Sequence, residues 1–177
     1  MAEKELSLVS EQVDLPVLPV YPPILRCLNA CHARQEKTAA HMLEIVVSDP
    51  ALTFLACRFA TQQSGANTGN PGFLLAQIED MPSEIFLAIT RWSLAWQHAQ
   101  QTPLLNEGSH YFWHRALNHA FVAQSLAEKT GLFTPDSGYM MGLFLDLGRL
   151  DFLKKTRGQY LADILSLSPE DRLVHER

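Results

Sequence analysis

The sequence lacks a surplus of basic residues and lacks long apolar runs. Its 14 Lys and Arg are outnumbered by 19 Asp and Glu, which gives a net charge of -5 at pH 7. This balance argues against non-specific binding to nucleic acid or to an anionic membrane, because both depend on a basic patch. No apolar run approaches the roughly 18 residues of a membrane-spanning helix, and residues 1–14 lack the apolar core of a secretory signal. We expect a cytoplasmic protein with a poorly ordered extension at 1–14.

Cysteine is also scarce. The cysteines, Cys27, Cys31 and Cys57, form no framework of disulfide pairs, and the first two are one helical turn apart. That spacing favours small core residues over metal ligands. The chain has no G-x-S-x-G motif, and the glycines of the expected loop at 63–72 do not have the spacing of a phosphate-binding loop. We therefore expect neither nucleophilic catalysis nor a bound cofactor.

Helical periodicity runs through almost the whole chain. Hydrophobic residues make up 47% of it, and they recur at the spacing of amphipathic helices instead of alternating as in strands. Residue types also mark helix boundaries: Asp49 and Pro50 suit an N-cap and a first helical position, and Gly131 suits a C-cap. Thr134 and Pro135 predict a further helix start. The sequence therefore predicts an all-α fold.

The segment "TPLLNEGS" at 102–109 is the expected break between two packed helical lobes. Its proline, glycine and asparagine disfavour a continuous helix, and Ser109 can cap the helix that follows. We expect one domain over 15–177, with an N-terminal lobe at 15–107 and a second lobe at 108–177.

One acid, Asp146, lies in the apolar stretch "GLFLDLGRLDFL" at 142–153. An unpaired charge in such a setting costs on the order of several kcal/mol, so Asp146 needs a partner. Helical metal-dependent phosphohydrolases place a His-Asp doublet at the end of one helix and further His and Asp ligands on others. The residue before Asp146 is Leu145, so this doublet is broken.

Other histidines are the remaining candidates for nitrogen ligands. His110 and His114 are four residues apart on one expected helix, a spacing that can hold zinc or nickel. The aromatic residues at 111–113 and the lack of a nearby cysteine or carboxylate pair favour ordinary exposed histidines, and His119 lies off the face of the pair. The sequence therefore predicts no metal ligands.

Trp92 and Trp96 are four residues apart on another expected helix and belong to its apolar face. Such a pair is typical of core or lobe-interface packing, whereas a pair that stays partly exposed would mark a binding groove. With Trp113, these residues are the candidate groove for a protein partner or, in a weaker interpretation, for a small ligand between the lobes.

Four stretches follow the pattern of one known family. They are "LPVLPVYPPILRCLN" (15–29), "IVVSDPALTFLACRFA" (45–60), "YFWHRALNHAFVAQSLAEKTG" (111–131) and "YMMGLFLDLGRLDFL" (139–153). These stretches resemble the opening, the "W-x-H-S" helix and the "A-G-L-L-H-D-I-G-x-L" segment of the HDOD domain, the HD-related output domain of bacterial signalling proteins. The resemblance runs from Leu15 to the C-terminus and is loosest over 61–100.

The resemblance also implies what the site has lost. In catalytic HD relatives one histidine occupies the position of Arg115 and another that of Leu145, so only Asp146 persists here. Arg115 is expected to pair with Asp146, as a cation in the place of a metal. The implied function is a non-catalytic signalling module that binds another signalling protein or domain, or a second copy of itself. It is expected to bind no nucleic acid, membrane, metal or cofactor.

The alternative is a metal-dependent phosphohydrolase of the HD superfamily that acts on a nucleotide or cyclic dinucleotide. This alternative requires new ligands from His110, His114 or His119 to meet Asp146. Metal analysis and phosphoesterase assays separate the two hypotheses.

The last stretch, "LSLSPEDRLVHER" at 165–177, contains a helix start. Ser168 suits the N-cap, Pro169 the first helical position, and Asp171 the third position of a capping box. Only about two turns follow, with no stop signal. We therefore expect a C-terminally incomplete domain, with an apolar patch left open on the second lobe near the helix of Trp113.

Overall fold

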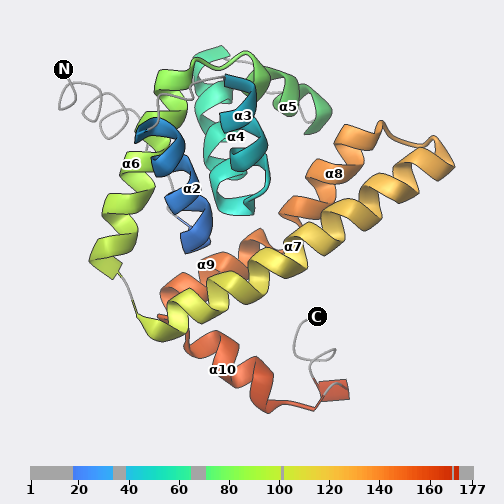
Figure 1. The fold of residues 1–177 in the computed structure, drawn as a ribbon. Coiled ribbons are helices and arrows are strands. Elements are labelled where there is room, and N and C mark those ends of the chain that lie inside the picture. The colour runs from blue at the N-terminus through green and yellow to red at the C-terminus, as the bar shows by residue number, and fades with distance from the viewer. Residues whose placement is uncertain (1–17, 34–38, 65–70, 101, 169, 172–177) are drawn as a thin grey trace.

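The computed structural model describes residues 18–33, 39–64, 71–100, 102–168 and 170–171. Every regular element in these residues is an α-helix, which confirms the predicted all-α fold (Figure 1). In chain order the helices are α2 (Pro22–Ala33), α3 (Ala39–Val47), α4 (Pro50–Ser64), α5 (Pro71–Glu79), α6 (Ser83–Gln100), α7 (Pro103–Thr130), α8 (Pro135–Phe144), α9 (Leu147–Lys155) and α10 (Gln159–Ser166).

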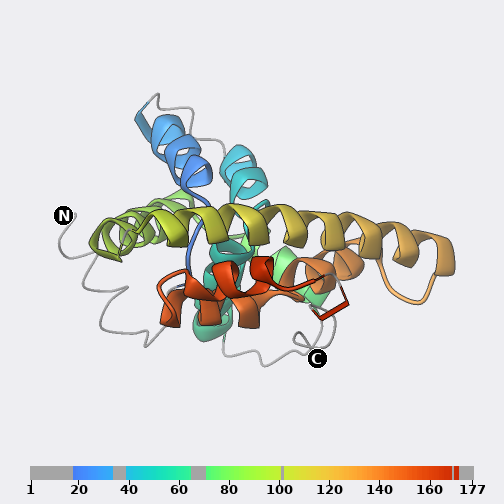
Figure 2. The same ribbon diagram turned by 90° about the horizontal axis from the view of Figure 1, so that it is seen from below.

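The helices form two groups that share one core. Helices α2 to α6 lie together in Figure 1, and the long α7 crosses below them with α8 packed along its second half. Helices α9 and α10 lie along the first half of α7, as the view from below in Figure 2 shows. One cluster of buried side chains runs through both groups, from Leu28 and Phe86 to Phe112, Leu153 and Ile164. The two groups are therefore held together by continuous apolar packing.

Helix α4 begins where the sequence predicted, at Pro50 after Asp49. Oδ1 of Asp49 accepts hydrogen bonds from the backbone N–H groups of Ala51 at 2.9 Å and Leu52 at 3.0 Å. Oδ2 accepts a third from the N–H of Tyr21 at 3.0 Å. The carboxylate thus satisfies donors at the helix N-terminus and ties the segment before α2 to the start of α4.

Helix α7 begins earlier than predicted, and "TPLLNEGS" is its first two turns. Thr102 is the N-cap and Pro103 takes the first helical position. Ser109, the predicted cap, is buried inside the helix. The prediction was wrong because the interior glycine has a packing role: a Cβ at Gly108 would lie 2.3 Å from Cδ1 of Leu153. The Thr102-Pro103 pair favours the start of a helix more strongly than a single glycine favours its end.

Helix α8 packs against α7 at backbone contact distance. A Cβ at Gly138 would lie 2.7 Å from the carbonyl oxygen of Ala123, and one at Gly142 would lie 2.3 Å from that of His119. Because glycine has no Cβ, it alone permits this approach. The close packing holds the C-terminal end of α8, and Asp146 just beyond it, beside the middle of α7.

The other predicted helix signals agree with the structure. Gly131, at φ 64°, ends α7, and Thr134 caps α8. The hydroxyl of Ser168 accepts from the N–H of Asp171 at 3.2 Å and donates to its carboxylate at 2.6 Å, which is the expected capping interaction. Several predictions concern residues outside the described ranges: the extension at 1–14, Pro169, and the apolar pair Leu173 and Val174.

The cysteines are core residues only in part. Cys31 and Cys57 are buried, but Cys27 is exposed, so the prediction for Cys27 was wrong. The reason is that α2 buries the face carrying Leu25 and Leu28, and Cys27 lies off that face.

Within the described ranges, no single helix is both long and apolar enough to cross a membrane. In the part of the chain that the structure describes, α3 and α4 taken together, as Ala40–Val47 and Pro50–Thr61, reach that length and composition, and they are bent by 120°.

Candidate functional site

Asp146 lies between α8 and α9, and its side chain is only 1% exposed. It occupies the N-cap position of α9, and its carbonyl oxygen accepts from the N–H of Leu150 at 3.2 Å. Its carboxylate makes no capping hydrogen bond. The carboxylate instead meets charged side chains, as a buried acid must if it is to stay ionised.

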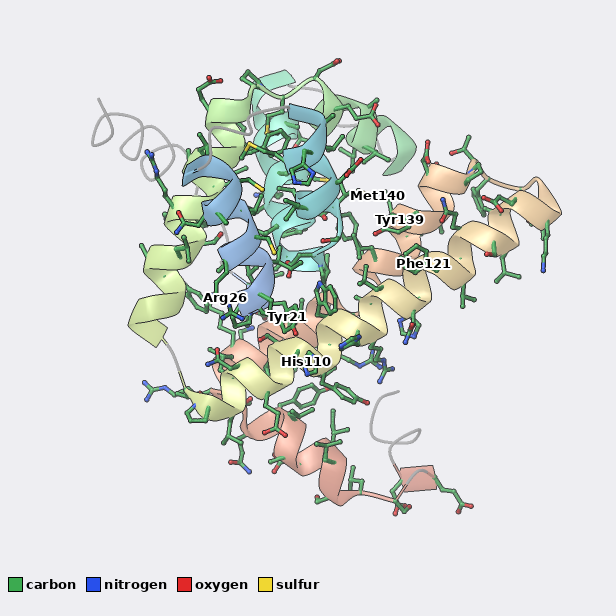
Figure 3. The ribbon with its side chains drawn as sticks, in the orientation of Figure 1. Tyr21, Arg26, His110, Phe121, Tyr139 and Met140 are labelled. Carbon is green, nitrogen blue, oxygen red and sulfur yellow. The ribbon has the colours of Figure 1, made fainter. Side chains whose placement is uncertain are left out.

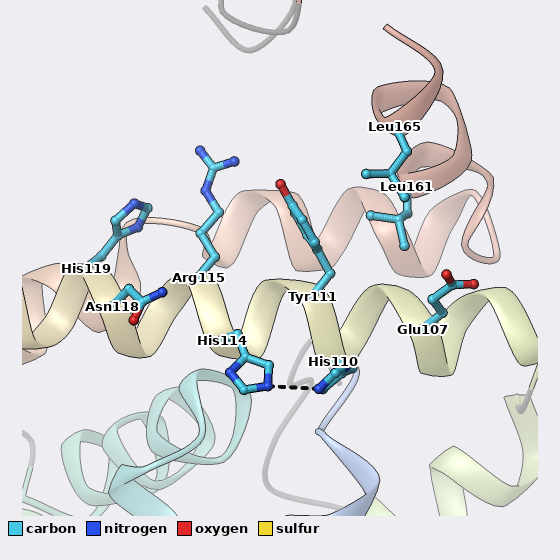
Figure 4. A pocket seen from close by; sticks show the side chains of 9 residues that line it. All are labelled: Glu107, His110, Tyr111, His114, Arg115, Asn118, His119, Leu161 and Leu165. Atoms are coloured by element: carbon cyan, nitrogen blue, oxygen red, sulfur yellow. Dashed lines mark hydrogen bonds between the residues drawn. The ribbon is translucent and has the colours of Figure 1, made fainter. Parts of the chain in front are cut away.

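Three side chains surround this carboxylate. Nε of Arg115 lies 3.1 Å from Oδ2, and Nδ1 of His119 lies 3.2 Å from the same oxygen. Arg149 contacts Oδ1 through Nη1. Arg115 and His119 are one turn apart on α7 and extend to the same side of it in Figure 4, whereas Arg149 comes from the first turn of α9. Helices α7 and α9 thus converge on one acid.

Two atoms of this group lack a directed hydrogen bond. Oδ2 of Asp146 and Nδ1 of His119 are buried, and neither has a hydrogen-bond partner, although their separation from each other is within ion-pair range. An ion pair does not need the alignment that a hydrogen bond needs. The attraction at Oδ2 is therefore mainly electrostatic.

The predicted pairing of Arg115 with Asp146 is confirmed. The sequence did not reveal Arg149, and it brought His119 to Asp146 only as a possible metal ligand in the phosphohydrolase alternative. A signal existed for both: Arg149 follows Asp146 at the i, i+3 spacing of helical ion pairs, and His119 follows Arg115 at i, i+4. Neither spacing by itself indicates that four side chains meet.

This charge cluster is poorly suited to bind a metal ion. A guanidinium stays protonated and has no lone pair to donate, so Arg115 and Arg149 neutralise Asp146 without being ligands. Across the described residues, no group of three or more His, Cys, Asp and Glu side chains is placed to hold a metal ion. The side chains around Asp146 are therefore those of an ion cluster that stabilises the fold.

His110 and His114 lie on another part of α7. Their Nε2 atoms are 2.8 Å apart, and both rings are exposed. A pocket of about 490 Å³ lies along this part of the helix (Figure 4). It is lined by α7 side chains from Glu107 to His119 and by Leu161 and Leu165 of α10.

The three candidate groove tryptophans have different surroundings. Trp113 is half-buried and packs against Tyr21 with ring centroids 4.5 Å apart and planes tilted by 31°. It donates its indole N–H to the carbonyl of Ser48 at 2.8 Å. Trp96 borders a small hollow of about 200 Å³ beside Lys154, whose Nζ lies 5.5 Å from the ring centroid. Trp92 packs against the main core. Each tryptophan thus has its own packing partners.

Exposed large apolar side chains gather on the α7–α8 hairpin. Leu145 is 64% exposed, and Leu132, in the connection between the helices, is 75% exposed. We define the hairpin surface by its exposed members: Phe121, Val122, Leu126, Leu132, Phe133, Met141 and Leu145. Three of these residues, Phe121, Val122 and Leu126, belong to α7, the helix that also carries Trp113.

Comparison with known families gives one match, to the HDOD domain over residues 86–176. Searches of curated proteins and of solved structures returned no significant match. The matched range is just over half of the chain and contains α7, α8 and the Asp146 cluster. The first two stretches that resembled the family, 15–29 and 45–60, lie outside it. The chain therefore belongs to the HDOD domain family.

Proposed function

We propose that this protein is a non-catalytic signal-transduction module that acts by binding another signalling protein or domain. Membership of the HDOD family supports a role as an HD-related output domain. The non-catalytic character and the mode of action rest on the geometry of the Asp146 cluster and of the hairpin surface.

The observation that carries the proposal is the arginine pair at Asp146. Arg115 and Arg149 supply the positive charge that the buried carboxylate needs. A guanidinium stabilises the acid, but it cannot make a bound water acidic enough to attack a phosphoester, as a metal ion does. The cluster therefore serves to hold α7 and α9 together.

The hairpin surface supports action through a protein partner. Large apolar side chains exposed together are unusual on a monomer and commonly mark interaction sites. Val122 and Leu126 are one turn apart on α7, and Leu145, the C-cap of α8, follows Met141 by one turn. A partner that covers these side chains would remove a large apolar area from water.

An activity assay tests the non-catalytic part. The full chain is incubated with Mn²⁺ or Mg²⁺ and with bis-p-nitrophenyl phosphate or a cyclic dinucleotide. We expect no turnover above that of the Asp146→Asn variant, which removes the one persisting acid. Turnover by the wild type that Asp146→Asn abolishes would instead establish the alternative, an HD-type phosphohydrolase.

That alternative has one observation in its favour. His119, one of its required ligands, does reach Asp146, with Nδ1 at 3.2 Å from Oδ2. His110 and His114 point toward each other, on the opposite side of α7 from His119 and Arg115 (Figure 4). The alternative would therefore require Arg115 to leave the carboxylate.

A second experiment tests the interaction part. The double variant Val122→Glu/Leu126→Glu places two charges on the hairpin surface, and Leu104→Glu places one on an exposed leucine at the start of α7 as the control. Two-hybrid screening with the wild type identifies a signalling partner, which is then tested against both variants. We expect the double variant to lose binding and the control to keep it. Equal binding by both variants would locate the interface elsewhere.

A further inference from the structure

His110 and His114 bring two imidazole nitrogens together on the exposed side of α7. They are separated by one helical turn, and their Nε2 atoms lie 2.8 Å apart (Figure 4). Their ring centroids are 4.5 Å apart and their planes cross at 74°. Sequence reasoning favoured ordinary exposed histidines, because it found no third ligand; the structure shows that two donor atoms already meet.

Aromatic packing holds both rings in place. The ring of Tyr21 stacks on His110 with centroids 5.1 Å apart at 24°, and Trp113 meets His114 edge-on at 4.8 Å. Tyr21 lies beside His110 in Figure 3, where the segment before α2 meets α7. Tyr21 is in turn fixed through its backbone N–H to Asp49 at 3.0 Å. The pair is therefore partly preorganised, which reduces the entropy lost when a ligand binds.

The separation of the two nitrogens is compatible with coordination of one metal ion by both rings. Two nitrogen ligands at ~2.0–2.1 Å from one ion are ~2.9 Å apart if they meet at a right angle, and ~3.3 Å apart at a tetrahedral angle. The observed 2.8 Å is closer to the right angle. Square-planar and tetragonal sites with nitrogen and oxygen ligands favour Cu²⁺ and Ni²⁺, whereas structural Zn²⁺ prefers a tetrahedron.

We propose that His110 and His114 form a two-nitrogen chelating site for a divalent transition-metal ion of tetragonal preference, Ni²⁺ or Cu²⁺. In the neutral pair one ring donates its Nε2–H to the Nε2 of the other; when the ion binds, that proton moves through solvent to Nδ1 of the same ring, so both rings present an Nε2 lone pair and no proton is released. Within the described residues no third His, Cys, Asp or Glu completes the site, so water fills the other positions. The bound ion is therefore exchangeable.

The site is independent of the proposed signalling function. Its two rings extend to the opposite side of α7 from Arg115 and His119 in Figure 4, although all four side chains line the same pocket. None of the Asp146 partners takes part. A metal ion at the histidine pair would leave the arginines at Asp146 in place. Metal binding and the non-catalytic proposal can therefore fail separately.

Calorimetric titration of the full chain with Ni²⁺ at pH 7.5 tests the site. We expect one equivalent to bind, and His110→Gln and His114→Gln each to weaken binding by about tenfold or more, because a single imidazole loses the effective concentration of the second. His41→Gln is the matched control, since His41 is an exposed helical histidine whose nearest partner is Glu44 at 3.8 Å. Circular dichroism confirms that each variant is folded.

A spectroscopic measurement gives an independent readout. Electron paramagnetic resonance of the Cu²⁺ complex, made with Cys27→Ser to remove the exposed thiol, is expected to show two imidazole nitrogens. Either histidine variant should reduce the count to one. Wild-type affinity in both histidine variants, loss of binding in His41→Gln, or a one-nitrogen spectrum in the parent would overturn the proposal.

Discussion

Two acids are buried to the same extent in different parts of the molecule. Asp49, before α4, and Asp146, before α9, are each 1% exposed. Asp49 is held by backbone N–H groups, from Tyr21 and from the first turn of its own helix. Asp146 is held by side-chain cations, chiefly Arg115 of α7 and Arg149 of α9.

The two acids differ in the kind of group that stabilises the carboxylate. Burial raises the pKa of Asp49 to about 6, and the hydrogen bonds from Leu52, Tyr21 and Ala51 offset only part of that rise. Backbone dipoles stabilise a carboxylate less than full positive charges do. Burial, which the capping hydrogen bonds offset only in part, thus makes Asp49 a titratable group near neutral pH, whereas two full positive charges face Asp146. A buried acid can terminate a helix or join helices, and its partners decide which.

Of the changes considered, removing both arginines beside Asp146 should lower the stability most. We expect Arg115→Ala/Arg149→Ala to lower the free energy of unfolding by about 4 kcal/mol, because the acid is left buried with His119 alone. Arg115→Ala alone should cost clearly less, since Arg149 remains. Urea unfolding measures both. Adding Asp146→Asn to the double variant should restore part of the loss, and strictly additive effects would show that the charges do not interact.

Separating α8 from α7 should disturb Asp146 and leave Asp49 intact. A methyl group at Gly142 would lie 2.3 Å from the carbonyl oxygen of His119, so Gly142→Ala must push the helices apart. We expect a loss of about 3 kcal/mol in thermal or urea unfolding. Gly148→Ala is the control: its Cβ would meet nothing within 4 Å, and a small gain from helix propensity is expected there. Equal effects of the two changes would contradict the close packing.

The titration of Asp49 should make the stability of the protein depend on pH. The pKa of Asp49 is about 6 in the folded chain against 3.8 ordinarily, so the folded state holds an extra proton between these values. The unfolding free energy should therefore fall as the pH rises from 4 to 6. The component is roughly 2 to 3 kcal/mol at 1.36 kcal/mol per pKa unit. Urea midpoints from pH 4 to 7 should lose this slope in Asp49→Asn, and parallel profiles would argue against it.

The smallest expected effect concerns the contact that links α7 to the Asp49 region. Trp113→Phe removes the indole N–H that bonds the carbonyl of Ser48 at 2.8 Å, next to Asp49. We expect a loss of about 1 kcal/mol, the usual contribution of one hydrogen bond. Trp92→Phe is the matched control, since Trp92 packs against the core. Similar melting temperatures for Trp113→Phe and the wild type would mean that packing against Tyr21 alone holds this junction.

Helix starts were the most predictable features, and one error among them is informative. The Asp49-Pro50 start was correct because its bonds join neighbouring residues. The break at "TPLLNEGS" was wrong because Gly108 was interpreted as a stop, whereas the structure uses it as a contact surface for Leu153. Local sequence cannot separate these two uses of glycine, since both depend on its missing side chain.

The sequence by itself determined the all-α class, most helix boundaries, the need of Asp146 for a cation, and Arg115 as its partner. These follow from hydrogen bonds and periodicities over three or four residues, and from a resemblance carried by short motifs. Only the tertiary structure decided that Arg149 and His119 join the same acid, and that Tyr21 stacks on His110 beside His114. Those meetings depend on how closely whole helices approach, and glycine contacts such as Gly142 against His119 set that approach.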